Sequence, residues 1–470
     1  MPIDIHYTLI ALLTVEQAHT LQAIPYKAGK NTLFFYVADG KEVDADMLEF
    51  LLGKRPVFTK LPPAEFERTL FQYYPQQQQN VGPIRQKSDS DVVSFVDQLF
   101  EGAVSIKASD IHIERYETYA RVRFRWEGQL LEKFEVPLDK YNAVISRIKI
   151  MSELDIAERR LPQDGRINLK LQGQQIDVRV SIIPSKFGEK AVMRLLTRSK
   201  TFLQLEKLGM KERALETYNR AIQRPNGIIL ITGPTGSGKT TTLYATLAKL
   251  NKPDINILTI EDPIEYNLEG INQVQVKDEI GLSFERALRS FLRQDPDIIM
   301  VGEIRDKETA EIAIRAALTG HLVFSTLHTN SALDAIVRLI DMGVAPYLIA
   351  SSVRLVVAQR LIRILCDNCK RLEKDTEEAK WRKEVQLPSL HEACGCVKCN
   401  YTGYSGRKAV YELVPVTADL EKDIKHNRVD RTAYYDNNPL QTTIKDEVNH
   451  LLQWGQTSSA EAEPYLSGDY

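Results

Sequence analysis

Residues 227–241 of the chain read GIILITGPTGSGKTT. The unbroken apolar run Gly227–Thr232 predicts a buried strand, and the helical spacing of Leu243 and Leu247 predicts a helix after the glycines. Between the two, residues 233–240 match the pattern G-x-x-x-x-G-K-[ST] in the strand–loop–helix setting that makes this pattern specific. The sequence therefore predicts a loop that binds a triphosphate, and not a chance glycine turn before a helix.

Each part of this loop has a physical task in such a site. Its glycines allow successive backbone N–H groups to point at phosphate oxygens, and the following helix adds the partial positive charge of its N-terminus. Lys239 supplies a cation to the β- and γ-phosphates, and the Thr240 hydroxyl binds Mg²⁺. We therefore expect ATP and Mg²⁺ as cofactors. The expected nucleotide-binding residues are Gly233, Pro234, Thr235, Gly236, Ser237, Gly238, Lys239, Thr240 and Thr241.

Two further apolar runs end in carboxylates. Residues 255–260 lead into Glu261, and residues 297–301 lead into Glu303. Ligands of open α/β sheets bind just beyond the carboxyl ends of the strands. An ATPase needs one carboxylate near the metal and one to orient or deprotonate the attacking water, and the sequence does not assign these two roles. A single acidic residue at the end of a strand is often a helix cap. Two such residues after a phosphate loop are both explained if they belong to the ATPase site.

A histidine follows the next apolar strand. His328 lies near the end of the segment that begins at Thr319, at a position suited to sensing a γ-phosphate. For His321 a structural role and a functional role are equally consistent with the sequence. Apolar strands alternate with helices from about residue 202 to 359, which predicts a largely parallel sheet covered on both faces.

The bulk composition limits the possible functions. The chain has 470 residues, of which 43% are hydrophobic and 26% charged, and its formal net charge is −2. Such a balance is ordinary for a globular protein and gives no overall attraction to nucleic acid or anionic lipid. The sequence shows no secretory leader and no run of the ~18 apolar residues that a membrane span needs. We therefore expect a soluble, cytoplasmic protein.

Changes of composition divide the chain into five parts. Helical spacing around Met47, Phe50 and Leu51 predicts a helix in the first part, and residues 119–126 alternate arginines with apolar residues, which predicts a strand with one cationic face. A glutamine-rich stretch bounded by prolines predicts a flexible tether. The expected division is a small N-terminal module (1–75), a linker (76–86), an α+β domain (87–200), the phosphate-binding core (201–360) and a C-terminal region with cysteines and helices (361–470).

All five cysteines lie between residues 366 and 399. Two pairs have the CxxC spacing, which places two thiolates on one side of a tight turn, and two such turns complete a tetrahedral zinc site. Cys394 is left over and competes with Cys396 as a ligand, although the CxxC spacing favours Cys396. Reduced structural cysteines are the alternative. The expected Zn²⁺ ligands are Cys366, Cys369, Cys396 and Cys399.

With these motifs the chain resembles the secretion superfamily ATPases that drive type II secretion and type IV pilus assembly. The resemblance runs from about residue 90 to 458 and includes residues 108–114 (ASDIHIE) and 160–166 (RLPQDGR). Residues 261–265 correspond to the acidic "Asp box" of that family, residues 297–303 to its Walker B segment and residues 319–328 to its "His box". The resemblance implies an α/β fold with a RecA-like P-loop core, preceded by a PAS-like α+β domain.

The resemblance also implies a homo-hexamer, in which arginines of the α+β domain reach the triphosphate of an adjacent core. Arg179 and Arg194 match those positions, and Arg289 matches a further site arginine. Surface ion pairs are the alternative for these side chains. The residues expected to act in catalysis are Glu303, Glu261, Lys239, Arg179, Arg194, Arg289 and His328.

The implied partners are an inner-membrane platform protein of a pilus or secretion system and, through the N-terminal module, a membrane adaptor. No specific nucleic acid is expected, and the chain is placed at the cytoplasmic side of the inner membrane. Retraction ATPases generally lack the segment with the two CxxC pairs (residues 366–399, the cysteine element). Its presence in this chain therefore favours assembly or secretion. One alternative is a nucleic-acid motor with a zinc ribbon, and the near-neutral charge of the chain weighs against it. The other is a non-catalytic nucleotide-binding scaffold, and the presence of both Lys239 and Glu303 weighs against it.

Overall fold

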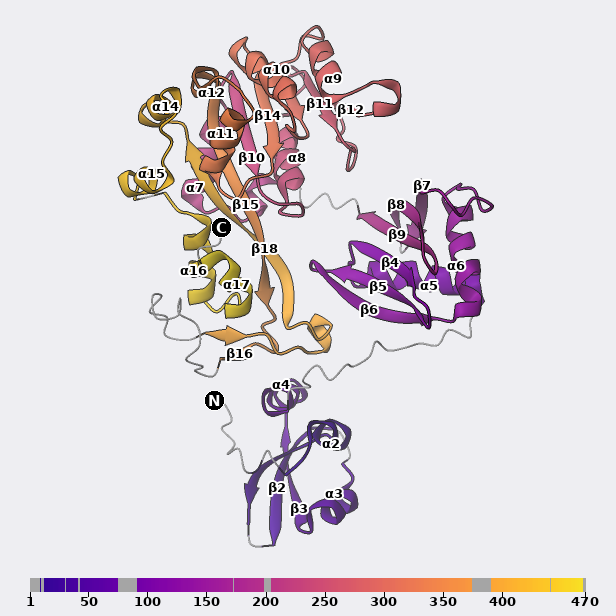
Figure 1. Ribbon diagram of the computed structural model, residues 1–470. Coiled ribbons are helices and arrows are strands. Elements are labelled where there is room, and N and C mark those ends of the chain that lie inside the picture. Colours follow the sequence, from indigo (N-terminus) through magenta and orange to yellow (C-terminus); the bar gives the residue numbers. More distant parts are fainter. Residues whose placement is uncertain are drawn as a thin grey trace. The chain divides into compact units, whose positions relative to one another are not determined.

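The computed structural model describes residues 9, 12–29, 31–40, 43–74, 91–171, 173–197, 204–373, 390–439 and 441–467 (Figure 1). The chain forms two compact units. The first consists of Met1–Gly82, Arg363–Gly406 and Leu451–Glu463, and the second of Pro83–Ile362, Arg407–His450 and Pro464–Tyr470. The expected tether at 76–86 and residues 374–389, between the two CxxC pairs, lie outside the described residues.

The N-terminal module is a three-stranded sheet with helices. Strand β2 lies in the centre, antiparallel to β1 and parallel to β3. A helix is present where Met47, Phe50 and Leu51 predicted one, but its fully buried side chain is Leu48, while Phe50 is 84% exposed. The elements are α2 (Val15–Leu21), β1 (Ala23–Ala28), β2 (Thr32–Ala38), α3 (Ala45–Leu52), β3 (Arg55–Leu61) and α4 (Pro63–Tyr73).

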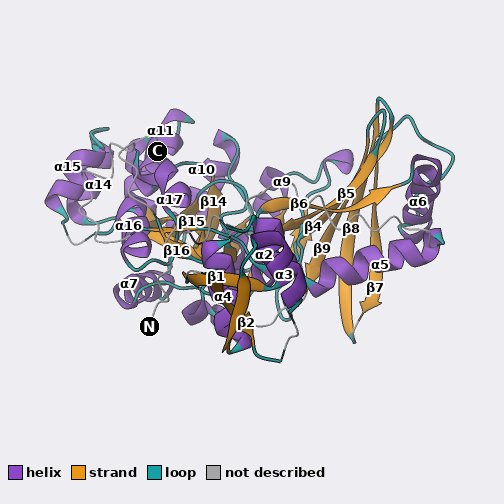
Figure 2. Cartoon of the chain, turned by 90° about the horizontal axis from the view of Figure 1, so that it is seen from below, coloured by secondary structure: helices purple, strands orange, loops and turns teal. Residues whose placement is uncertain are grey.

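A six-stranded antiparallel sheet in the order β6-β5-β4-β9-β8-β7 forms the α+β part of the second unit (Figure 2). In β5 every second side chain is buried, and the arginines between them lie on the other face, as the alternation predicted. The two helices pack on the apolar face. The elements are α5 (Val92–Ser105), β4 (Asp110–Arg115), β5 (Ala120–Trp126), β6 (Gln129–Val136), α6 (Leu138–Met151), β7 (Gln163–Leu171), β8 (Gln174–Ser185) and β9 (Gly188–Thr197).

A seven-stranded sheet in the order β12-β11-β13-β14-β10-β15-β18 forms the core, and its pairings from β12 to β15 are parallel. Its first elements are α7 (Glu212–Ile222), β10 (Gly227–Thr232), α8 (Lys239–Leu250), β11 (Ile257–Glu261), β12 (Asn272–Gln275) and α9 (Phe284–Phe291). They are followed by β13 (Ile298–Val301), α10 (Lys307–Leu318), β14 (Leu322–Leu327), α11 (Ala332–Asp341), α12 (Pro346–Ser352), β15 (Val353–Leu365) and β18 (Tyr404–Pro415).

Strand β10 lies inside this sheet, and all of its residues are buried. Ile229 and Ile231 belong to the same hydrophobic cluster as Leu243 of α8, whereas Ile228 and Leu230, which face the other way by the period of two, are also fully buried. Helices therefore cover both faces of the strand, and α10 and α11 contact it as well. The predicted α/β class with a parallel core sheet is confirmed.

The C-terminal residues complete the core and form the cysteine element. Strand β18 joins the core sheet next to β15, and its fully buried Glu412 accepts hydrogen bonds from the amides of Ala332 (2.8 Å) and Ile444 (3.4 Å). This carboxylate thus connects the starts of α11 and α16. The remaining elements are β16 (Arg371–Leu372), β17 (His391–Glu392), α14 (Ala418–Lys425), α15 (Arg431–Asn437), α16 (Ile444–Gln453) and α17 (Ser459–Leu466).

Candidate functional site

The loop of residues 233–238 connects the carboxyl end of β10 to α8 and is backed by β15. Gly233 has φ 150° and Gly238 has φ 88°, conformations that side chains disfavour. A Cβ atom on Gly233 would lie 2.5 Å from the carbonyl oxygen of Gln359, and one on Gly238 would lie 2.8 Å from the Gln359 Nε2. Close contact with β15 therefore requires glycine at both positions.

Lys239, the first residue of α8, is only 9% exposed. Its Nζ donates hydrogen bonds to the carbonyl oxygens of Gly233 (2.7 Å) and Pro234 (3.1 Å). Burial lowers the pKa of Lys239 to about 8, Glu303 opposes this shift, and Arg360 adds to it. The lysine is thus a partly desolvated cation whose hydrogen-bond partners are neutral carbonyls, an arrangement suited to an incoming phosphate.

Neighbouring hydroxyls fit a phosphate and a metal ion. Ser237 is 3% exposed, and its buried Oγ has no hydrogen-bond partner among the described residues. Such an orphaned donor inside a phosphate loop is satisfied when a phosphate oxygen binds. Thr240 is exposed one residue beyond the lysine, so its hydroxyl is accessible to a metal ion held by the phosphates. These residues fit ATP and Mg²⁺.

Glu303 lies two residues beyond β13 and faces charged neighbours. Arg305 donates to its Oε1, and His328 Nε2 lies 3.6 Å from its Oε2. Burial and the charge of Lys239 lower the pKa of His328, Glu303 opposes this shift and Arg305 adds to it, so the imidazole is neutral near pH 7. Glu303 and His328 both interact electrostatically with Lys239, which brings the predicted carboxylate and histidine to the phosphate loop.

Glu261 has a different environment. It ends β11, is 3% exposed and accepts hydrogen bonds from the Thr259 hydroxyl (2.6 Å), the Gln273 amide (3.1 Å) and the hydroxyl of Tyr244. Three donors fix this carboxylate, and Tyr244 connects it to α8, the helix that begins with Lys239. Glu261 is therefore a fixed, buried anchor, whereas Glu303 is the carboxylate that faces the loop.

Two residues of β15 at this site were missed from the sequence. Gln359 accepts a hydrogen bond from the Thr242 hydroxyl (2.8 Å), and Arg360 donates to the Gln359 carbonyl (3.0 Å) and to the Asn330 carbonyl (2.7 Å). Each is 2% exposed. The signal was available, because these two adjacent polar residues interrupt the otherwise apolar residues 355–362 of β15. They attach the phosphate loop and the segment after β14 to one strand.

The three predicted arginines have carboxylate partners within this chain. Arg194 of β9 lies 3.0 Å from Asp110, and Arg289 of α9 lies 2.8 Å from Glu285 on the same helix. Arg179 of β8 lies 3.3 Å from Glu265. No contact of these three side chains with residues 233–241 is found in the described part of this single chain. The arginine side chains of positions 194 and 289 are 58% and 59% exposed, which leaves them accessible to a further anion.

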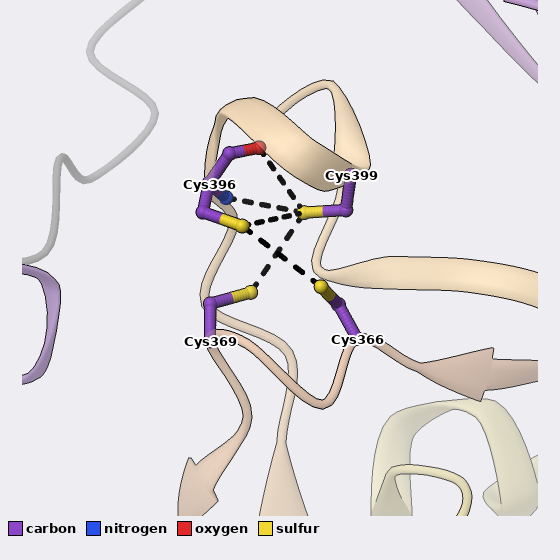
Figure 3. A group of neighbouring side chains, drawn as sticks. All are labelled: Cys366, Cys369, Cys396 and Cys399. Carbon is purple, nitrogen blue, oxygen red and sulfur yellow. Dashed lines mark hydrogen bonds between the residues drawn. The ribbon is translucent and has the colours of Figure 1, made fainter. Parts of the chain in front are cut away.

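Four cysteines gather in the first unit. The Sγ atoms of Cys366, Cys369, Cys396 and Cys399 all lie within 4.8 Å of one another, and all four residues are buried (Figure 3). Sγ–Sγ distances are 3.9 Å for the 366–396 pair and 3.7 Å for the 369–399 and 396–399 pairs. A tetrahedral ion with Zn–S bonds of about 2.3 Å requires S–S edges of about 3.8 Å.

The backbone also favours thiolates at this cluster. The amides of Cys396 (3.1 Å) and Gly403 (3.3 Å) donate to the Cys399 sulfur. Cys394 stands apart, because its Sγ points to the Glu392 carbonyl at 3.9 Å. The four sulfurs and their donors therefore fit Zn²⁺, with Cys396 rather than Cys394 in the set.

Residues 85–463 match the family described as "Type II/IV secretion system protein". The chain belongs to this family. The secretion ATPase is accordingly an ATP-hydrolysing enzyme with a P-loop core, and the predicted family resemblance is confirmed.

Among characterised relatives, the type IV pilus assembly ATPase PilB of Myxococcus xanthus is 44% identical over 449 residues, which cover 89% of this chain and 79% of that protein. The type II secretion system ATPase E of Vibrio cholerae is 46% identical over 386 residues, 82% of this chain and 77% of that protein. The relatives therefore include both pilus assembly and type II secretion ATPases.

Solved structures show the same fold. The ATPase DotB of Legionella pneumophila aligns with a TM-score of 0.61 at 20% identity, covering 83% of this chain and all of that chain. The pilus retraction motor PilT with bound ADP aligns with a TM-score of 0.54 at 26% identity, covering 78% of this chain and 95% of that chain. The α/β fold with a RecA-like core is thereby supported independently of the motifs.

The pKa of Lys239 predicts how nucleotide affinity of the secretion ATPase depends on pH. Below pH 8 the lysine is already protonated, whereas above pH 8 the nucleotide-free site has lost this proton and must regain it when an anionic phosphate binds. The affinity for Mg-ADP should therefore fall as pH rises from 8 to 9.5, with a slope approaching tenfold per pH unit. Calorimetric titration measures this.

Lys239→Arg is the matched control, because a guanidinium stays charged throughout this range. Its affinity should change little with pH, whatever its absolute value. Parallel pH profiles for the two proteins would contradict the assignment of the titration to Lys239.

Proposed function

We propose that the chain assembles as a homo-hexamer and hydrolyses ATP to power the assembly of a type IV pilus or of a type II secretion pseudopilus at the inner membrane. The observation that carries this proposal is the pairing of a phosphate-ready loop with a carboxylate facing it, in a chain whose relatives are named as pilus assembly and type II secretion ATPases. An intact site of this kind argues for a motor and against a non-catalytic scaffold.

We assign the two carboxylates different tasks. Glu303, beside the neutral His328 and within the field of Lys239, orients and deprotonates the attacking water. Glu261 positions α8 through Tyr244. The phosphates and the Thr240 hydroxyl would hold Mg²⁺, which would supply positive charge to the phosphate oxygens. The loop residues 233–241 bind the phosphates through their N–H groups and Lys239.

Arginines of a neighbouring subunit complete the site in this proposal. Arg194 and Arg289 are more than half exposed, so an anion from another subunit can compete for their guanidinium groups. Arg179 already forms an ion pair with Glu265, the last residue of the acidic segment 261–265. A guanidinium in contact with the γ-phosphate contributes ~10³–10⁵ in rate, which would couple hydrolysis to assembly of the ring.

The proposed partners are an inner-membrane platform protein and, for the N-terminal module, a membrane adaptor. Among the described residues no helix is long and apolar enough to cross a bilayer. From its likeness to pilus assembly and type II secretion ATPases, we propose a cytoplasmic protein that is peripheral at the inner membrane through protein contacts. No specific nucleic acid is included, and ATPase stimulation by DNA that weakens with salt would contradict this point.

The substitution Glu303→Gln tests the motor. Phosphate release should fall by roughly 10²–10⁴ because the base is lost, while Mg-ATP binding persists. The trapped Mg-ATP complex should sediment as six copies of the 53.5 kDa chain. In the host organism this variant should fail to restore surface filaments or secretion to a deletion strain.

Glu308→Gln is the control, because Glu308 is an exposed residue of the neighbouring helix α10. It should behave as wild type in all three assays. Full phosphate release by Glu303→Gln would refute the catalytic assignment, and a monomer with bound ATP would refute the hexamer.

We further propose that the four cysteines hold one Zn²⁺ that fixes the cysteine element. Purified protein should contain about one zinc per chain by metal analysis, and Cys396→Ser should lose it, because three thiolates bind zinc far more weakly than four. The metal-free variant should also become sensitive to proteolysis between residues 363 and 406.

Cys394→Ser separates the two possible ligand sets. It removes a thiol close in sequence without touching the cluster and should retain full zinc content. If Cys394→Ser loses zinc and Cys396→Ser retains it, Cys394 and not Cys396 is the fourth ligand. If the wild-type protein contains no zinc, the proposed zinc site is wrong.

A further inference from the structure

A cavity of about 520 Å³ lies in the second unit and shares no lining residue with the phosphate loop or the cysteine cluster. Its walls come from α7, from the first residues of β15, from β18 and from residues 441–447. The volume is in the range of small-molecule sites. No step of the proposed ATPase reaction uses these residues.

Arginines dominate one wall. Arg213, Arg220 and Arg224 follow one another at intervals of seven and four, so α7 and the turn after it present them on one side, with Thr217 between them. Arg354 joins them from β15. Four arginines thus line a single cavity.

Among the described residues these four arginines form no ion pair, although the charge of Glu421 acts on Arg354. Within the described part of the chain, no carboxylate lies within ion-pair distance of Arg213, Arg220, Arg224 or Arg354. Glu447 is the only acid among the described residues that line the cavity, and its carboxylate pairs with Lys211 at 2.8 Å. Clustered like charges repel one another, and this cost is removed when an anion binds among them.

Arg354 is the most enclosed of the four. It is half-buried, and its Nε is buried without a hydrogen-bond partner among the described residues. Burial lowers its pKa, and the charge of Arg224 lowers it further, although Glu421 opposes the shift. A buried guanidinium nitrogen next to a second arginine is a donor that lacks an acceptor.

The backbone makes room for this arginine. A Cβ atom on Gly227 would lie 2.3 Å from Arg354 Cγ and 2.7 Å from its Nε, so the side chain crosses directly over the glycine at the start of β10. Gly227 also has φ 128°, which disfavours any other residue. Both effects keep position 227 open for the arginine stem.

The other residues that line the cavity are less polar. Leu355 and Leu413, which are buried in the core, and Pro415 contribute apolar atoms, and Gln441 and Thr442 contribute an amide and a hydroxyl. Four arginines together with a few apolar and polar groups suit a compact molecule that carries one or more phosphates. A flat protein surface would not reach the half-buried Arg354.

We propose that this cavity is a second anion site, distinct from the ATP site, that binds a phosphate-bearing ligand through Arg213, Arg220, Arg224 and Arg354. Guanidinium forks match phosphate oxygens in pairs, and charge-assisted hydrogen bonds are the strongest that side chains make. The phosphates can belong to a free small molecule or to a lipid headgroup.

The test uses the full chain with saturating Mg-ADP, which fills the phosphate loop, at 150 mM salt. Inorganic pyrophosphate is titrated calorimetrically, and vesicles of neutral phospholipid with or without one-fifth acidic phospholipid are sedimented with the protein. Arg220→Ala/Arg224→Ala is compared with Arg315→Ala/Arg338→Ala, which removes two exposed arginines from α10 and α11 and so matches the loss of charge.

We expect at least one probe to bind the wild type, with affinity at least tenfold weaker in Arg220→Ala/Arg224→Ala and unchanged in the control. Pyrophosphate binding identifies a free ligand, and binding to acidic vesicles alone identifies a headgroup. The proposal is overturned if neither probe binds, or if both double variants lose binding equally. It is also overturned if Arg220→Ala/Arg224→Ala only lowers the oligomeric mass, since the cavity would then be a subunit contact.

Discussion

The arrangement of the core depends on a lysine cation that is kept partly away from water. Lys239 is almost buried, and two backbone carbonyls are its hydrogen-bond acceptors. Carbonyls compensate a cation less well than an anion does, which is why burial lowers its pKa. A phosphate supplies the missing negative charge. The phosphate loop, strand β15 behind it and the buried Glu261 each help to hold Lys239 in this position.

The strand behind the loop sets its shape. Gln359 lies so close to Gly233 and Gly238 that no side chain fits at either position, and Arg360 connects the same strand to the Asn330 carbonyl. Glu261 holds the other side of α8 through Tyr244. The loop is thus fixed from two directions, and Glu303 and His328, which lie just beyond β13 and β14, face it with their charged and polar groups.

Much of this site could be predicted from the sequence because its signals are local. The loop pattern identified Lys239, and strand ends in a parallel sheet identified Glu261 and Glu303, which need only the rule that ligands bind at carboxyl ends. The separate environments of the two glutamates could not be predicted, because Tyr244, Thr259 and Gln273 reach Glu261 only through the tertiary fold.

Other features depend on contacts between distant segments. The place of β18 in the core sheet and the buried Glu412 follow from packing that no local pattern reports. The cationic sheet face is largely neutralised: burial raises the pKa of Glu114, but hydrogen bonds from Arg123 and Lys190 outweigh it and bring the pKa to about 2. In α3 the apolar spacing gave the helix but not its buried face, since Leu48 and not Phe50 packs inward.

The most direct measurement is nucleotide affinity and thermal stability of the Lys239→Met variant, in which the side chain keeps its length and loses its charge. The account predicts that Mg-ADP affinity falls by roughly 10- to 100-fold, while the nucleotide-free variant unfolds at the same or a higher temperature because a desolvated cation is gone. Affinity retained within a factor of two would contradict the account, because the phosphate would then not be held by this lysine.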